Sequence, residues 1–378
     1  MVEPVPVTED EVRVPSIELF FDLVFVFTIT QLTHLVEEAH DAVGFLRALV
    51  VLTLVWWIYA GYSWLTNDAG AGRQMRLVLL AGMGGFLVIA LSIPTVFGDG
   101  GLAFGLAYLF VVVLHLFAFV LKAGRRSARA VLGLAPFNLG AAALVIAAGL
   151  VDAAWDWLFL LAAAGLYVTS TILRRHEGFS INASHFAERH GLVILIALGE
   201  SVVAIGSGAS EHAIDAAGLV PVLLALLLIA TLWWSYFDED DERAERLLVA
   251  APPGARPGIA VFGYWYGHLA MIFGIVLLAS GVKHVVAHPA EAMHGAAWLL
   301  ASGTAIYLLG DALFRSVIGL RPVLLRALGA VVALGLGAVG LVWGGVAELG
   351  ALVALALATL MLERRLERGD RKSLPGPS

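Results

Sequence analysis

The sequence predicts an all-α, polytopic membrane protein of about 12 transmembrane helices, arranged as two parallel six-helix repeats. Three observations support this fold class. First, 60% of the 378 residues are hydrophobic and 14% are charged, whereas soluble domains are about 45–50% apolar and about 25% charged. Second, apolar runs of about 20 residues, long enough to cross a bilayer as helices, recur without the alternation typical of a β-barrel. Third, parts of the first half recur in the second.

Each apolar run is a candidate membrane-spanning helix. The first fifteen residues contain four acids and one arginine, so they do not resemble a secretory signal peptide, and the first run should remain as a span. The last two runs are separated by only Trp343-Gly344-Gly345. In order, the runs lie near residues 17–36, 44–65, 76–97, 101–121, 129–150, 155–173, 187–208, 218–237, 259–282, 293–313, 322–343 and 345–362.

Basic residues are strongly segregated between the two sides of the predicted membrane. If odd-numbered runs start on the side of the N-terminus, only Arg47 and Lys283 of the 23 basic residues lie on the opposite side. Because loops rich in lysine and arginine stay in the cytoplasm, both termini are predicted to be cytoplasmic. The asymmetry also favours an even number of spans.

The two halves resemble each other weakly. Trp56-Trp57 in run 2 corresponds to Trp233-Trp234 in run 8 at an offset of 177, and both pairs precede acidic residues. Six spans per half give both halves the same topology, as in transporters built from parallel repeats. Chance similarity between apolar helices is the alternative. The predicted divisions are a cytoplasmic segment 1–15, repeats 16–178 and 179–363, and a basic tail 364–378.

Composition excludes several classes of function. The chain has no cysteine, which excludes disulfides and thiolate chemistry. The net charge is −7 and no basic arm with interleaved aromatic residues is present, so nucleic-acid binding has no support. We find no Walker loop, zincin helix or nucleophile elbow. We therefore predict no cofactor, no metal centre and no enzyme activity, with the lipid bilayer as the main partner and homo-oligomers favoured by the glycine- and alanine-rich runs 5, 11 and 12.

Two acidic residues in the first run are the strongest functional signal. Glu18 and Asp22 are four residues apart and share a helix face with Phe25 and Ile29. A carboxylate at mid-bilayer costs about 3 kcal/mol on the insertion scale, so such acids usually face protein or water. Glu18, Asp22, Phe25 and Ile29 are therefore candidates for lining a transport path.

Run 7 carries the corresponding acid. An offset of 178 pairs Asp22 with Glu200. A pseudo-twofold axis would place the two carboxylates at comparable depth, where they could attract a cation or share a proton. The alternative is that each acid is bound by an arginine or by a Tyr or Trp donor and only fixes helix packing.

Other polar residues have simpler interpretations. His185, Glu188, Arg189 and His190 are expected to form a solvated start of run 7, and Asp238–Glu242 a solvated loop. His115, His268 and Asp311 lie within runs and are candidates for a proton relay or for satisfied core positions. The opposite side is rich in histidine and acids, which as a default are solvated and as an alternative sense pH or bind metal: His34, Glu37, Glu38, His40, Asp41, Glu211, His212, Asp215, His284, His288, Glu291 and His294.

Two motifs resemble those of a known family. Glu18-Leu-Phe-Phe-Asp-Leu-Val-Phe-Val-Phe-Thr-Ile-Thr-Gln31 and His185-Phe-Ala-Glu-Arg-His-Gly-Leu, followed by Ile196-Ala-Leu-Gly-Glu-Ser-Val-Val-Ala-Ile-Gly206, resemble the signatures of the bacterial low temperature requirement A (LtrA) family over about residues 10–365. The resemblance implies a multi-pass protein of the bacterial cytoplasmic membrane that is needed for growth in the cold. The motif positions carried over are Glu18, Phe21, Asp22, Glu188, Arg189, Gly199 and Glu200.

A weaker similarity suggests a mechanism. Phe21-Asp22-Leu-Val-Phe25 is similar to the Phe-Ser-Asp motif in the first helix of endolysosomal and bacterial potassium channels with six-helix repeats, in which that helix lines the pore. Here Phe21 replaces the serine, and run 7 has Leu198-Gly199-Glu200. The leading hypothesis is permeation or transport of a small cation, including H⁺, along runs 1 and 7. The rivals are a proton-coupled solute carrier, a non-conducting envelope scaffold, lipid-handling or cold-stress factor, and, third, a membrane enzyme using the histidine-rich side.

Overall fold

A computed structural model describes residues 14–69, 72–122, 124–151, 154–173, 181–210, 215–291 and 293–373. The described part of the chain contains twelve helical spans that are long and apolar enough to cross a membrane, which confirms the predicted fold class. The elements are α1 (Ser16–Glu37), α2 (Ala42–Ala69), α3 (Arg73–Ser92), η1 (Ile93–Thr95), α4 (Gly101–Lys122), α5 (Arg125–Ala148), α6 (Asp156–Leu173), α7 (Ala183–Ala209), α8 (Ala216–Phe237), α9 (Asp240–Ala250), α10 (Arg256–Ile259), η2 (Ala260–Gly267), α11 (His268–Ala287), η3 (His294–Ala296), α12 (Ala297–Ile318), α13 (Leu324–Trp343) and α14 (Gly345–Ser373).

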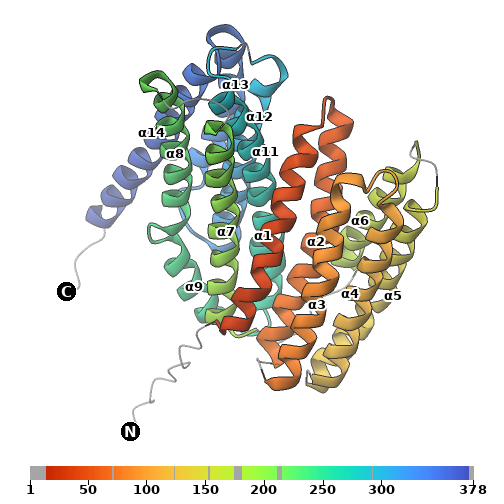
Figure 1. Ribbon diagram of the computed structural model, residues 1–378. Helices are drawn as coiled ribbons and strands as arrows, with labels where there is room; N and C mark the ends of the chain where they lie inside the picture. Colours follow the sequence, from red (N-terminus) through yellow and green to blue (C-terminus); the bar gives the residue numbers. More distant parts are fainter. Residues whose placement is uncertain are drawn as a thin grey trace, which may run out of the picture.

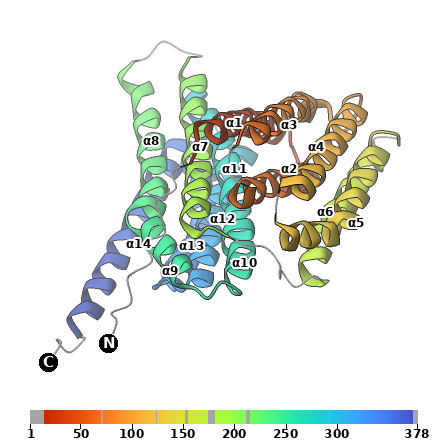
Figure 2. The same cartoon turned by 90° about the horizontal axis from the view of Figure 1, so that it is seen from below.

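The helices form two groups that meet at α1 (Figure 1). Helices α2–α6 lie on one side, with α5 and α6 at the periphery, and α7–α14 lie on the other (Figure 2). Helix α1 contacts α2 and α3 as well as α7 and α11. The proposed boundary between repeats falls in residues 174–180, outside the described residues, and the repeat itself stays a prediction.

Helix α11 is the most deeply buried span. It packs against α7 and α12, and glycines allow the closest approach. A Cβ added to Gly274 would lie 2.6 Å from the carbonyl oxygen of Gly303, and one added to Gly303 would lie 2.6 Å from the amide nitrogen of Leu278. Small residues serve close helix packing in membranes in this way. Gly199 and Gly206 of α7 do not serve such contacts, since neither position has an atom within 4 Å of an added Cβ.

Spans 8 and 9 exceed their predicted lengths the most. The acidic run after run 8 was expected to be a solvated loop, but Asp240 begins α9, whose first turn also contains Asp241 and Glu242. Acidic residues stabilise a helix N-terminus through the helix dipole. Glu239, with φ 146°, makes the turn between α8 and α9. Span 9 begins at Arg256 and passes through the π-helix η2 before α11.

Candidate functional site

The ends of α1, α2 and α7 are joined by a set of polar side chains that we call the first network: Glu18, Asp22, Tyr59, Thr66, His185 and Arg189. Helix α7 begins after Asn182, whose side chain accepts a hydrogen bond from the backbone of His185. The Asn67 amide of α2 binds the backbone of Asn182 twice, donating to its carbonyl and accepting from its N–H, each at 2.9 Å. These two bonds fix the start of α7 against the end of α2.

The same amide determines the hydrogen bonding of His185. Because Asn182 fixes which end of the Asn67 amide is nitrogen, the Asn67 contact with His185 Nδ1 at 3.2 Å is a donation to the ring. The proton of a neutral His185 is then on Nε2, which lies 3.2 Å from Glu18. His185 is 4% exposed, so the expectation of a solvated helix start is wrong.

Arg189 holds both acids of α1. Its guanidinium is fully buried and donates to Glu18, to Thr66 at 2.8 Å and to Asp22 at 3.1 Å. Glu18 also accepts from Thr66 at 3.0 Å. Glu188, the residue before Arg189, accepts from the backbone N–H of Val14 at 3.2 Å. The first network thus pairs two carboxylates with one guanidinium.

Asp22 is enclosed by aromatic side chains. Tyr59 donates to it at 2.6 Å, and the Phe25 and Tyr59 rings stack at 4.3 Å. Phe21 also stacks on Tyr59, at a centroid distance of 5.9 Å. Phe25 and Ile29 are 1% and 0% exposed. The five cavities described for this fold have none of these side chains in their walls, so this stretch of α1 is packed core.

Replacing Tyr59 with phenylalanine is expected to lower the free energy of unfolding by about 1.5–3 kcal/mol, the usual value of a hydrogen bond to a charged group. Thermal unfolding in detergent micelles measures the change. Tyr264→Phe is the matched control, because the Tyr264 hydroxyl is also buried but has no partner among the described residues, so its loss should be neutral or stabilising. Equal effects of the two substitutions would contradict the role assigned to Tyr59.

Glu200 does not stand at the depth of Asp22. Its carboxylate accepts from Thr30 at 2.7 Å, eight residues further along α1 than Asp22, a rise of about 12 Å. Helices α1 and α7 therefore run in the same direction, with a contact register of about 170 residues instead of the 178 of the sequence match. The expected pair of neighbouring carboxylates is not formed.

Glu200 also differs from Asp22 in its surroundings. It is 4% exposed and forms no ion pair among the described residues. It interacts electrostatically with His34, Glu37 and Lys283. Glu37 binds Lys283 at 2.9 Å and His34 at 3.2 Å. Thr30 is thus the one hydrogen-bond partner of Glu200 in the described structure.

A large cavity opens beyond Glu37 and Lys283, at the end of the bundle opposite the first network. It has a volume of about 910 Å³, and its wall also includes His40, His284 and His288. In the described residues no set of three or more histidine or acidic side chains has the arrangement of a metal site. Glu211 and His212 lie outside the described residues, as does the side chain of His294.

The three candidates for a proton relay are not bonded to one another: His268 and Asp311 lie on the packed helices α11 and α12, and His115 lies on α4 in the other helix group. His115 in α4 contacts the carbonyl oxygen of Gly61 at 3.0 Å. His268 in α11 binds the Tyr236 hydroxyl at 2.9 Å. Asp311 in α12 is bound by Arg326. All three are buried and hydrogen-bonded, which matches their interpretation as core positions.

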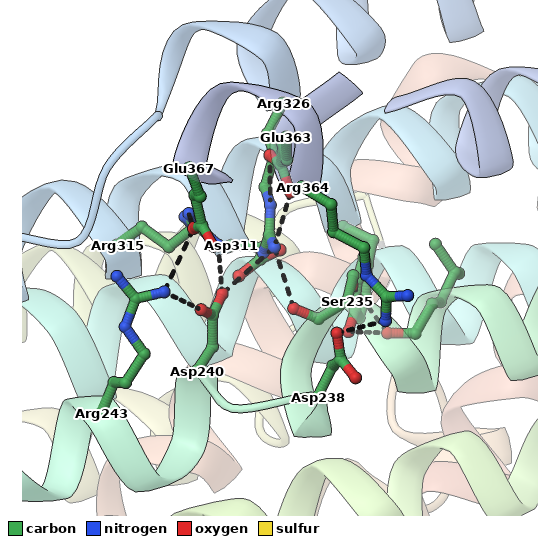
Figure 3. A network of polar contacts seen from close by, with 12 residues as sticks. Ser235, Asp238, Asp240, Arg243, Asp311, Arg315, Arg326, Glu363, Arg364 and Glu367 are labelled. Atoms are coloured by element: carbon green, nitrogen blue, oxygen red, sulfur yellow. Dashed lines mark hydrogen bonds and ion pairs between the residues drawn. The ribbon is translucent and has the colours of Figure 1, made fainter. Parts of the chain in front are cut away.

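Sequence reasoning missed a second buried cluster, which joins the start of α9 to α12, α13 and α14 (Figure 3). The second network contains Asp240, Asp311, Arg315, Arg326 and Glu363, each at most 7% exposed. Arg326 binds Asp311, Glu363 at 3.0 Å and Asp240 at 3.1 Å, while Arg315 also binds Asp240. The available signal was Arg326 itself, a cation inside a predicted span that requires a partner.

Comparison with known proteins gives two matches. Residues 13–363 match the family described as bacterial low temperature requirement A protein (LtrA). The chain is also 27% identical over 296 residues to an uncharacterized protein of Rhizobium meliloti (strain 1021), which covers 74% of this chain and 71% of that protein. The family match includes the first network and Glu200.

Proposed function

We propose, since the chain belongs to the bacterial low temperature requirement A (LtrA) family, that it transports protons or another small cation, alone or coupled to a small solute. Its site would be the bacterial cytoplasmic membrane, with both termini in the cytoplasm, and it would support growth at low temperature. We infer a carrier that changes conformation instead of an open pore, because Phe25 and Ile29 are packed in the core.

The observation that carries this proposal is the environment of Glu200. A carboxyl inside a membrane-spanning helix that faces the protein interior without an ion-pair partner is suited to bind and release a proton. Glu200 has only the Thr30 hydroxyl as its hydrogen-bond partner among the described residues. Asp22 is not suited to this role, since Arg189 and Tyr59 already bind it.

The cavity of about 910 Å³ whose wall includes Glu37 and Lys283 would supply the path to Glu200. Glu37 lies seven residues beyond Thr30 in α1, a rise of about 10 Å. Leu32 and Thr33 lie in that interval and are both at most 3% exposed. The described conformation is therefore closed between the cavity and Glu200, and transport requires movement of α1 against α7 or α11.

Glu200→Gln is expected to reduce cation-dependent proton flux in proteoliposomes to the level of protein-free liposomes, since an amide cannot exchange a proton. An entrapped pH-sensitive dye reports flux under Na⁺, K⁺ and pH gradients. Asp99→Asn is the matched control, because Asp99 is exposed in the segment between η1 and α4. Flux that is unchanged in Glu200→Gln would remove Glu200 from the proposal.

A non-conducting scaffold is the second candidate. The observation that favours it is the full burial of Asp22 against Arg189 without an adjoining cavity, as expected for a residue that fixes helix packing. The same assay separates the two functions, because a scaffold predicts no flux above protein-free liposomes for wild type under any cation or pH gradient.

A further inference from the structure

Helix α1 is held against α7 and α11 by polar contacts at three levels. Near its start, the first network binds α1 through Arg189 of α7. Further along, Thr30 donates to Glu200 of α7 at 2.7 Å. Near its end, Glu37 forms an ion pair with Lys283 of α11 at 2.9 Å. Both residues of this last contact belong to the wall of the large cavity.

Helices α7 and α11 are packed backbone to backbone at the level of the cavity. A Cβ added to Gly208 of α7 would lie 2.6 Å from the carbonyl oxygen of Lys283 and 3.2 Å from the amide nitrogen of Ala287. Glu200 and Lys283 therefore stand on two closely joined helices. An opening toward Glu200 is easier between α1 and this helix pair than within the pair.

The space between Glu200 and the cavity is filled by small polar side chains. Thr33 follows Thr30 by three residues, so it shares the face of α1 that carries Thr30 and Glu37, and it is 3% exposed. Ser280 lies three residues before Lys283 on α11, belongs to the cavity wall and is also 3% exposed. The cavity thus ends just past the Glu37–Lys283 pair.

The contact at the cavity is weaker than the contact at the opposite end of α1. The side chains of Glu37 and Lys283 are each 24% exposed, and water screens ion pairs of this kind. Arg189 is fully buried and donates to two carboxylates and one hydroxyl. Breaking a buried pair costs far more, so the end of α1 at the cavity should separate first.

We propose that the Glu37–Lys283 ion pair is a latch that closes the large cavity off from Glu200 and that opens before the first network does. An open latch gives water and a small cation access to Glu200 while the first network still closes the other end. The cavity wall contains three acids, Glu37, Asp41 and Glu291, against the single lysine, so it attracts cations whether or not the latch is closed. The use of the latch rests on the proposed transport function, but its opening is measured without transport.

Cysteine labelling tests the latch directly, because the chain has no cysteine and one introduced thiol reports only on its own position. Thr33→Cys is the reporter, in purified protein in nanodiscs, labelled with a membrane-impermeant maleimide and followed by mass spectrometry. Lys283→Met and Glu37→Gln are each expected to accelerate labelling about two- to fivefold, the range for a partly exposed ion pair. The double variant should be no faster than the faster single variant, since both remove the same contact. Ser280→Cys is the second reporter if Thr33→Cys does not fold.

Three controls make the result specific to the latch. Ala42→Cys, at an exposed position of the cavity wall, should be labelled equally fast with and without Lys283→Met. Ser63→Cys is 1% exposed on α2 and adjoins the first network through Thr66, so its labelling should stay slow. Glu291→Gln removes an exposed acid from the same wall and should leave the labelling of Thr33→Cys unchanged.

The outcomes separate the latch from the transport proposal. Unchanged labelling of Thr33→Cys in both single variants, multiplied effects in the double variant, or equal acceleration at Ser63→Cys would overturn the latch. If flux depends on Glu200 but labelling does not respond to Lys283→Met, transport stands and the latch fails. The expected labelling in a protein without flux would support the latch and remove transport.

Discussion

Arg189→Met is expected to lower the free energy of unfolding by about 3–5 kcal/mol, the usual cost of removing one partner from a buried ion pair. Glu18 and Asp22 would both remain buried without their guanidinium. Thermal unfolding in detergent micelles measures the loss. Arg246→Met is the matched control, because the Arg246 side chain is 64% exposed and pairs with exposed Glu242, so its effect should not exceed about 1 kcal/mol.

A compensating variant separates charge from packing. If the loss in Arg189→Met comes from unpaired carboxylates, adding Glu18→Gln and Asp22→Asn should recover most of it, since neutral side chains are far less costly to bury. Failure of this triple variant to recover stability would assign the loss to the packing of the arginine against Phe21 and Tyr59, which lie 5.9 Å and 5.8 Å from its guanidinium carbon.

Arg326→Met is expected to lower the free energy of unfolding by at least about 3–5 kcal/mol, because it also removes one partner from buried ion pairs. Arg326 binds Asp311, Glu363, Asp240 and the carbonyl oxygen of Ser235. Without it, Arg315 is the remaining buried cation for the three buried acids of the second network. The same unfolding measurement applies. Arg365→Met is the control: Arg365 is exposed on α14, two residues after Glu363, so its loss should change the free energy of unfolding by no more than about 0.5 kcal/mol.

Rescue by Asp311→Asn would confirm the electrostatic origin of the second effect. Asp311 is fully buried, and one of its carboxylate oxygens already lacks a hydrogen-bond partner among the described residues. The double variant is therefore expected to be more stable than Arg326→Met alone. A double variant that is equally unstable would show that Arg326 acts through its bonds to Glu363 and Ser235 instead.

The placement of the acids shows where sequence reasoning reaches its limit. Glu18, Asp22 and Glu200 were correctly identified as acids inside apolar helices, because hydropathy alone shows their cost in lipid. Their depth was inferred from a repeat offset, which matches residue types but does not measure helix register. The Arg189 and Thr30 contacts set a different register and separate Asp22 from Glu200.

The arginines were misjudged for a related reason. Arg189 and Arg326 lie near span ends, where positive charge is expected to meet cytoplasmic water. Both are at most 2% exposed, because acids from other helices reach them. The signal was a cation within a few residues of an apolar run, but its partners lie 15 to 171 residues away in the sequence.

The sequence by itself determined that this chain is an all-helical membrane protein with twelve spans, because the length and hydropathy of each span are local properties of the chain. Its two motifs likewise indicated the LtrA family. Tertiary structure alone decided which acids are neutralised by arginine and which keep only a hydroxyl partner. That outcome depends on how helices distant in the sequence align side by side. Asp22 and Thr30 are about two turns apart on α1, and the first contacts Arg189 while the second contacts Glu200.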